Sequence, residues 1–293
     1  ADSCHIYLNT FSNNNASTVG AIYSISNNVV SSLENGNTFI NNFGYFANDV
    51  FETDTPNMTI SNGEYILVYC NSTYNGQLPS SYNLKTLGYV TPVKDQKTGG
   101  NCWAFATLAA LESCILKASN VTYDLSEENM KNLMSYYSDY GWDMKPNNGG
   151  FDDMGVGYLV SWLGPVNESD DAYNPSGFLS PVLNSFYHIQ NVVYLSRSSY
   201  TDNNAIKMAI MNYGAVATSI HWNGFYVNNN NHYYYGSSGA NHAITIVGWD
   251  DNYSKYNFKT APPGDGAWII KNSWGTDSGD KGYYYVSYYD TKY

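Results

Sequence analysis

A helix that begins at a cysteine does most to limit the folds open to this chain. From Cys102 to about Lys117 apolar residues recur at three- and four-residue steps, which predicts a helix with an inward face of Phe105, Leu108, Ala109, Leu111, Ile115 and Leu116. Further helices are predicted after Leu125, with Ser126 as N-cap, over 155–163 and over 203–212. Strands are predicted over 215–220, 243–247, 268–271 and 283–288. Because helices come first and strands later, the sequence predicts an α+β fold with two lobes.

The first 77 residues differ in composition from the rest. They hold six acidic residues and no Lys or Arg, and short β-branched and aromatic stretches alternate with Asn, Ser and Gly clusters, which favours short strands. We therefore expect a β-rich segment over 1–77 and a second domain over 78–293. Fragments that begin at Phe11 and Phe39 lie 28 residues apart and resemble the repeats of surface adhesins built as parallel β-solenoids. A propeptide or an unrelated β-rich extension is the alternative, and a disulfide between Cys4 and Cys70 would close the segment in an oxidising compartment.

Charge and apolar content argue against two classes of function, nucleic-acid binding and membrane spanning. The formal net charge is −12, and such an acidic chain repels the phosphate backbone of nucleic acids. No apolar run approaches the roughly 20 residues that a membrane span needs. The histidines other than His242 have no Cys, Asp or Glu at metal-ligand spacing, so neither a metal site nor a cofactor is expected.

The start of the predicted helix favours a reactive thiol. Gly99 and Gly100 permit a tight turn, and Asn101 is a suitable N-cap for a helix whose first residue is Cys102. A thiol at a helix N-terminus faces the positive end of the helix dipole, which favours the nucleophilic thiolate. A buried, inert cysteine is the alternative, and it is the interpretation we give to Cys114.

A nucleophilic cysteine needs a base and a group that orients the base. His242 is placed at the head of a buried strand, and Asn272 at the end of another. Cys102, His242 and Asn272 are therefore candidates for these three roles.

Several motifs, in this order, resemble those of the papain-like cysteine peptidases, and the resemblance covers nearly all of 78–293. They are Gly88-Tyr89-Val90-Thr91-Pro92-Val93-Lys94-Asp95-Gln96, Cys102-Trp103-Ala104-Phe105, Asn148-Gly149-Gly150, Asn241-His242-Ala243 and Asn272-Ser273-Trp274-Gly275. The resemblance implies the papain-like two-lobe fold, with a helical lobe and a lobe like a β-barrel.

The resemblance also implies a role for each matching residue. Cys102 would attack the scissile carbonyl, His242 would exchange the proton, and Asn272 would orient the imidazole. Gln96 would form the oxyanion hole with the Cys102 backbone N–H. Trp274 would cover the Asn272–His242 hydrogen bond, Gly149 and Gly150 would bind extended peptide, and Asn241 would border the substrate.

The chain departs from the family pattern in three places that matter, one of them Asn101 before the nucleophile, where serine is common and asparagine should be tolerated as a cap. The family usually has a disulfide just before the nucleophile, but its two positions are here Gly99 and Asn147, so the loop must be held otherwise. After the glycine pair the chain reads Phe151-Asp152-Asp153, where an apolar wall is more usual. A carboxylate at Asp152 would favour a cationic or polar substrate side chain, unless the pair faces solvent.

The sequence thus predicts a monomeric cysteine endopeptidase that cleaves peptide or isopeptide bonds at the cell surface or wall. Its partners would be polypeptide or wall-peptide substrates. Two alternatives stay open: a zymogen with 1–77 as inhibitory propeptide, and an adhesin or binding module with a vestigial peptidase fold. The joint presence of Gln96, Cys102, His242 and Asn272 disfavours the last.

Overall fold

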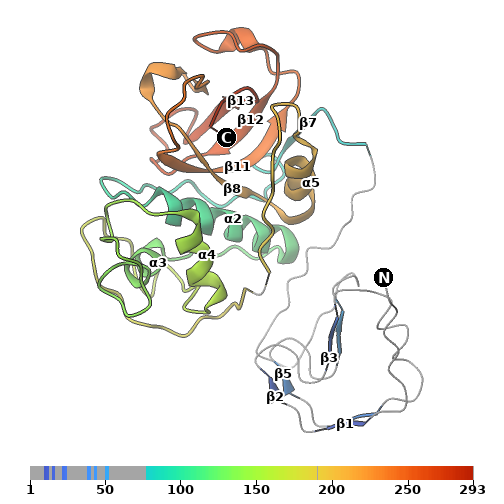
Figure 1. Ribbon diagram of the computed structural model, residues 1–293, viewed down its shortest axis with the longest axis vertical. Coiled ribbons are helices and arrows are strands. Elements are labelled where there is room, and N and C mark those ends of the chain that lie inside the picture. The colour runs from blue at the N-terminus through green and yellow to red at the C-terminus, as the bar shows by residue number, and fades with distance from the viewer. Residues whose placement is uncertain are drawn as a thin grey trace. The chain divides into compact units, whose positions relative to one another are not determined.

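The computed structural model describes residues 77–189 and 191–292 with their side chains, and the backbone of six short strands between residues 10 and 52 (Figure 1). The chain divides into two compact units, Ala1–Thr73 and Tyr74–Tyr293. Each unit is described by itself.

The strands of the N-terminal unit pair in parallel. They are β1 (Thr10–Ser12) with β4 (Thr38–Ile40), β2 (Asn15–Ala16) with β5 (Phe43–Gly44) and β3 (Ile22–Ser24) with β6 (Val50–Glu52). Every pair has the same offset of 28 residues, so that Phe11 lies opposite Phe39. The predicted Cys4–Cys70 disulfide lies outside the described residues.

The helices of the second unit follow the predicted order. They are α2 (Cys102–Ser119), α3 (Glu127–Leu133), α4 (Asp152–Val160) and α5 (Asn204–Tyr213), with short 3-10 turns at η1 (Gly224–Tyr226) and η2 (Lys255–Asn257). The prediction of Ser126 as N-cap is confirmed, because its hydroxyl accepts the Asn129 N–H at 3.0 Å. α4 begins three residues before the predicted start, because the carboxylates of Asp152 and Asp153 in its first turn favour the positive end of the helix dipole.

A seven-stranded sheet forms the second lobe. Its strands are β7 (Ser81–Asn83), β8 (Val216–Ile220), β9 (Val227–Asn228), β10 (Asn231–His232), β11 (His242–Asp250), β12 (Ala267–Lys271) and β13 (Tyr283–Ser287). They run in the order β7-β11-β12-β13-β10-β9, and β8 pairs with β11 as well. All pairs are antiparallel except β10 with β13. The long strand β11, buried over almost its whole length, is therefore the centre of the lobe.

Helix α2 lies between the sheet and the other helices of its lobe, with α3 and α4 on its far side (Figure 1). It is consequently buried on more than one face: Trp103 and Ala104 are buried together with Leu108 and Ile115. The predicted inward face is only partly right, because Ala109 and Leu111 remain half-exposed. Because α2 lies between the sheet and the other helices, its first residue, Cys102, lies where the two lobes meet.

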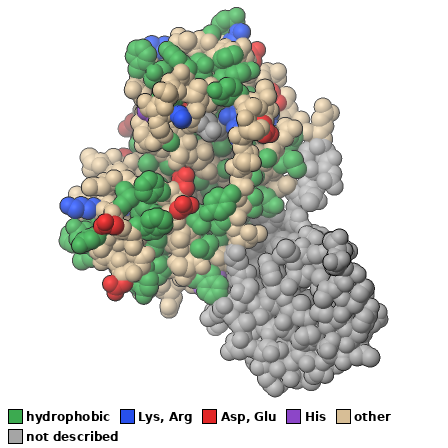
Figure 2. Space-filling view, in the orientation of Figure 1, with side chains coloured by type: hydrophobic (Ala, Val, Ile, Leu, Met, Phe, Trp, Pro, Cys, Tyr) green, Lys and Arg blue, Asp and Glu red, His purple; other side chains and the backbone are tan. Residues whose placement is uncertain are grey.

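Of the described helices, α2 alone has the length and apolar composition of a candidate membrane span. Of its most apolar window, 56% is buried inside the protein, and this helix carries the buried acid Glu112. These features are those of a core helix. The coloured residues in Figure 2 show few acidic or basic side chains among apolar and neutral ones, as the charged content of 13% requires.

Lys94, Glu112, Glu127 and Lys271 form a cluster of charged side chains that lines one cavity together with Asn272. The Lys94 ammonium lies 3.0 Å from a carboxylate oxygen of both Glu112 on α2 and Glu127 on α3, and 2.7 Å from Asp124. Burial acts to lower the pKa of Lys94, but Glu127, Glu112 and Asp124 outweigh it and raise the pKa above its ordinary value. Burial lowers the pKa of Lys271, the last residue of β12, to about 8.

Replacing Lys94 with methionine is expected to destabilise the fold by about 3–5 kcal/mol at pH 7, because it leaves the buried Glu112 carboxylate without its cation. The pKa of Lys94 is raised by folding, so its contribution is fully present at neutral pH and is lost only as the pH rises through the folded-state value. The Glu127 carboxyl, whose pKa burial raises to about 8, gains its charge between pH 7 and pH 9, so the loss should grow at pH 9. Urea unfolding at both pH values measures this, with exposed Lys97→Met as the control; equal losses for the two variants would contradict it.

Candidate active site

Cys102 is the first residue of α2, at the end of a turn that the side chain of Asn101 helps to hold. Asn101 occupies the predicted N-cap position, but it does not cap the helix with its side chain. Its side chain makes no cap hydrogen bond; its amide nitrogen donates to the Pro146 carbonyl, and its amide oxygen accepts from the Tyr173 hydroxyl at 2.9 Å. Asn101 is fully buried, and its side-chain amide is hydrogen-bonded to the surrounding loops. Its backbone carbonyl accepts the first helical N–H groups.

The sulfur of Cys102 is half-buried and faces backbone donors. Burial raises the pKa of this thiol, and nearby Asp152 raises it further. Hydrogen bonds from the backbone N–H groups of Ala243, Trp103 and Cys102 itself oppose burial and favour the thiolate. The hydrogen bond from the Ala243 N–H places the Cys102 sulfur next to the residue that follows His242 in β11.

His242 opens β11 and is held by Asn272, which directly follows β12. The imidazole Nε2 lies 2.8 Å from Asn272 Oδ1, and both residues are buried. Burial lowers the pKa of His242 to about 4, with a smaller opposing effect of the Asn272 hydrogen bond. The bond directs the other ring nitrogen away from Asn272, so the structure places the predicted base and orienting group in contact.

Aromatic rings cover this pair. Trp274 stacks on the His242 ring at a centroid distance of 4.4 Å and an interplanar angle of 23°. Trp222 meets Trp274 edge to face at 5.0 Å and stacks on buried His232 at 4.6 Å. The rings of Trp274 and Trp222 therefore shield the histidine from water, which strengthens its hydrogen bond to Asn272.

Gln96 is fixed beside Asn272 by Ser273. Ser273 Oγ donates to Gln96 Oε1 at 2.6 Å, and the Gln96 backbone N–H donates to the Ser273 carbonyl at 2.8 Å. Gln96 Nε2 donates one hydrogen to the Gly99 carbonyl at 2.8 Å and keeps a second for another acceptor. Ser273 was missed as a site residue from the sequence, although it stands next to Asn272 in the motif.

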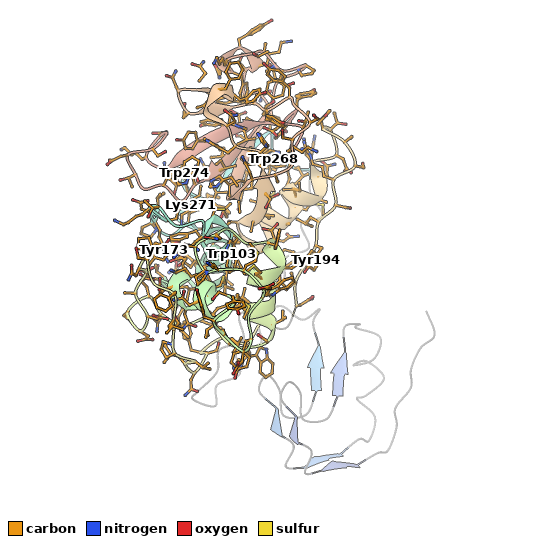
Figure 3. All side chains as sticks on the ribbon, turned by 60° about the vertical axis from the view of Figure 1, so that its left-hand side comes forward. Trp103, Tyr173, Tyr194, Trp268, Lys271 and Trp274 are labelled. Atoms are coloured by element: carbon orange, nitrogen blue, oxygen red, sulfur yellow. The ribbon has the colours of Figure 1, made fainter. Side chains whose placement is uncertain are left out.

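The glycine pair lies beside the nucleophile helix. Gly149 has a φ of +97°, which favours glycine, and a Cβ on Gly150 would come within 2.2 Å of the Trp103 indole nitrogen. Both positions therefore require glycine, for conformation at the first and for close packing at the second. Trp103 is the second residue of α2, and in the view of Figure 3 it lies below Trp274 and Lys271 and level with Tyr173.

The two remaining predicted residues have defined neighbours. The Asp152 carboxylate accepts from Ser219 Oγ at 3.2 and 3.3 Å, and burial raises its pKa. The Asn241 side chain is paired with the backbone of Trp222, accepting its N–H at 2.7 Å and donating to its carbonyl at 3.1 Å. Asn241 thus holds the loop that carries Trp222. Within residues 77–189 and 191–292 no three His, Cys, Asp or Glu side chains are grouped to hold a metal ion.

Residues 78–292 match a family model described as papain family cysteine protease. The chain belongs to the papain family. The predicted papain-like α+β fold is confirmed, since solved papain-family structures share it with TM-scores above 0.5.

Curated papain-family relatives are similar over most of this chain. It is 27% identical over 264 residues to cysteine proteinase 1 of Dictyostelium discoideum, covering 84% of this chain and 73% of that protein. It is 30% identical over 224 residues to cysteine proteinase 15A of Pisum sativum, covering 71% of this chain and 58% of that protein. The chain thus spans little more than half the length of the second relative.

Two solved structures show the same fold. The cysteine protease and lectin-like domains of Cwp84, a surface layer associated protein of Clostridium difficile, give a TM-score of 0.65 at 33% identity, over 73% of this chain and 49% of that one. The bromelain protease of Ananas comosus gives 0.57 at 22% identity, over 71% of this chain and 89% of that one, and shows the fold alone.

Proposed function

We propose that this chain is a cysteine endopeptidase that hydrolyses peptide bonds through a thioester intermediate. The observation that carries the proposal is the His242–Asn272 hydrogen bond of 2.8 Å beside a cysteine at the head of α2. Family membership of residues 78–292 supports the same reaction.

In this mechanism the thiol and imidazole act as one unit. Burial makes each charged form costly alone, because it raises the pKa of Cys102 and lowers that of His242. Transfer of the thiol proton to the imidazole creates both charges together, so that each stabilises the other, and Asn272 holds the ring in the required orientation. The helix dipole and the backbone donors around the sulfur stabilise the thiolate further.

The thiolate then attacks the scissile carbonyl, and a thioester replaces the amide bond. The carbonyl oxygen becomes an oxyanion, which the free hydrogen of Gln96 Nε2 and the Cys102 backbone N–H would stabilise. The proton on His242 passes to the leaving amine. Water, deprotonated by the same imidazole, hydrolyses the thioester and restores the thiol.

Alkylation tests this proposal against a binding module with a vestigial site. Fluorogenic peptides should be hydrolysed, and iodoacetamide should abolish hydrolysis in proportion to the modification of Cys102 followed by mass spectrometry. A folded chain that neither hydrolyses any peptide of a library nor reacts at Cys102 would establish the binding module instead.

We further propose that Asp152 selects cationic substrate side chains at the second residue before the scissile bond. Asp152 is exposed, but its carboxylate accepts from Ser219 and raises the pKa of Cys102, so it lies near the nucleophile and within reach of a substrate. A substrate lysine that covers this carboxylate would exclude water from it, and the attraction between the two charges would strengthen as a result.

Asp152→Asn is expected to lower kcat/KM for Lys-containing peptides about tenfold, an effect of about 1.4 kcal/mol, and to leave Leu-containing peptides nearly unchanged. Because burial raises the pKa of Asp152, the preference for Lys should fade as the pH drops through that raised value. Asp153→Asn, which removes the neighbouring and likewise exposed carboxylate, is the matched control. A wild-type preference for Leu would exclude the assignment.

We also propose that residues 1–77 form a separate segment and that the protein acts outside the cytoplasm, at a surface or wall. The surface-layer association of Cwp84 supports this location. Removal of residues 1–77 tests whether they inhibit: increased activity would identify an inhibitory propeptide, whereas unchanged activity would exclude one.

A further inference from the structure

The position where related proteases carry a disulfide half-cystine is filled by polar groups in this chain. A Cβ on Gly99 would lie 2.2 Å from Asn101 Oδ1 and 2.6 Å from the Tyr173 hydroxyl. Neither atom leaves room for a cysteine side chain. The space beside Gly99 therefore holds a hydrogen bond in place of a sulfur atom.

One side chain connects the two ends of the turn that precedes the nucleophile. The Tyr173 hydroxyl lies 2.8 Å from the Gln96 carbonyl oxygen and 2.9 Å from Asn101 Oδ1. Its ring packs edge to face on Phe105 of α2, with centroids 4.9 Å apart. Tyr173 is thereby fixed to the nucleophile helix while its hydroxyl holds the turn.

The loops around Tyr173 are anchored by a buried lysine of α3. Lys131 is completely buried, and its ammonium donates to the carbonyls of Asn174 and Gly177 at 2.8 and 2.9 Å and to Asn147 Oδ1 at 3.2 Å. Its charge is balanced by Glu128 at 3.1 Å. Lys131 thus ties the loop after Tyr173 to the loop that contains Asn147.

The Asn147 loop is in turn bonded to the turn. The Gly100 N–H donates to the Asn147 carbonyl at 3.1 Å, and the Asn101 amide donates to the neighbouring Pro146 carbonyl. The turn and this loop are the segments that the missing disulfide would have joined. In this chain the hydrogen bonds of Gly100 and Asn101 connect the two segments in place of the disulfide.

We propose that Tyr173 is a positioning residue for the oxyanion hole, and that with Lys131 it takes the place of the missing disulfide. The inference rests on the proposed function and deepens it. By holding the Gln96 carbonyl and Asn101 together, Tyr173 keeps the Gln96 amide and the Cys102 N–H directed at a single point. Such donors must lie about 2.7–3.1 Å from the position of the oxyanion, so a small shift of the turn weakens catalysis.

Tyr173→Phe is the test, because it removes the hydroxyl and keeps the ring on Phe105. The loss removes the hydroxyl that Asn101 Oδ1 and the Gln96 carbonyl share, and leaves the Gln96 carbonyl with the Gly99 N–H at 3.2 Å. Asn101 Oδ1 is buried and loses this donor, so the turn is expected to shift. We expect kcat to fall about tenfold while KM changes less than twofold, because Gly149 and Gly150 keep their places. The rate of Cys102 alkylation by iodoacetamide should be unchanged, since that displacement forms no oxyanion.

Tyr158→Phe is the matched control. Tyr158 is a fully buried tyrosine of the same lobe, and its hydroxyl donates to Asn129 Oδ1 at 2.7 Å, away from the turn. The Tyr158→Phe variant should be less stable than the wild-type protein and have the same kcat. Circular dichroism gives the folded fraction of each variant, and kcat is expressed per folded protein.

A double-mutant cycle with Gln96→Ala decides whether Tyr173 acts through Gln96. We expect the double variant to be no slower than Gln96→Ala alone. An unchanged kcat in Tyr173→Phe, or losses that multiply in full, would overturn the inference and leave the proposed function intact. If Gln96→Ala itself keeps full activity, the oxyanion role of Gln96 fails, and with it any action of Tyr173 through that residue.

Discussion

Replacing Cys102 with alanine is expected to lower kcat by about 10⁴- to 10⁶-fold, to the background of the assay. The sulfur is the atom that bonds to the substrate carbonyl, and neither His242 nor Asn272 can replace it. The remaining hydrogen-bond donors can still bind substrate, so peptide binding measured by fluorescence should change little. Hydrolysis of a fluorogenic peptide, measured with a folded-state check by circular dichroism, gives the result.

Cys114→Ala provides the matched control. This second thiol lies on the same helix, about 18 Å further along its axis at 1.5 Å per residue, and like Cys102 it is half-buried. Its replacement should leave kcat unchanged. If Cys102→Ala kept activity and Cys114→Ala lost it, the nucleophile would be misassigned.

Gln96→Ala should produce the next largest effect, a loss of about 10²–10³ in kcat with little change in KM. The amide is held rigidly, because Ser273 donates to its oxygen at 2.6 Å and its nitrogen donates to the Gly99 carbonyl. The second hydrogen on that nitrogen is aligned before the substrate arrives. Its interaction strengthens only as negative charge develops on the carbonyl oxygen, and for that reason kcat should carry the loss.

Steady-state kinetics of Gln96→Ala and Thr98→Ala measure this effect. Thr98 belongs to the same turn and is exposed, so its replacement tests whether any change in the turn impairs catalysis. Equal losses in the two variants, or a loss confined to KM, would argue against an oxyanion role for Gln96.

Local pattern was sufficient to predict the elements that carry the site. Apolar spacing placed α2, and the Gly99-Gly100-Asn101 turn placed Cys102 at its first residue. The β-branched run after His242 predicted a buried strand, and β11 does begin at that histidine. These predictions succeed because helix and strand periodicity depend on near neighbours, and because His242 and Asn272 stand at the ends of such elements.

Local pattern failed where a polar side chain is used by a distant segment. Asparagine is a residue type that N-caps favour, yet the side-chain amide of Asn101 is bonded to Pro146 and Tyr173. Lys131 sits on a short helix like any surface lysine, but it is completely buried because carbonyl groups from a later loop surround its ammonium. No spacing rule links such residues, because they lie more than 40 positions apart.

By itself, then, the sequence determined the family, the two-lobe fold and the four residues proposed for catalysis, since each lies in a short motif with its own local geometry. Only the tertiary structure decided how the turn before Cys102 is held without a disulfide, and which way Asp152 is directed. The physical reason is that a buried polar group must find a partner wherever the folded chain provides one, and that partner is set by packing in three dimensions.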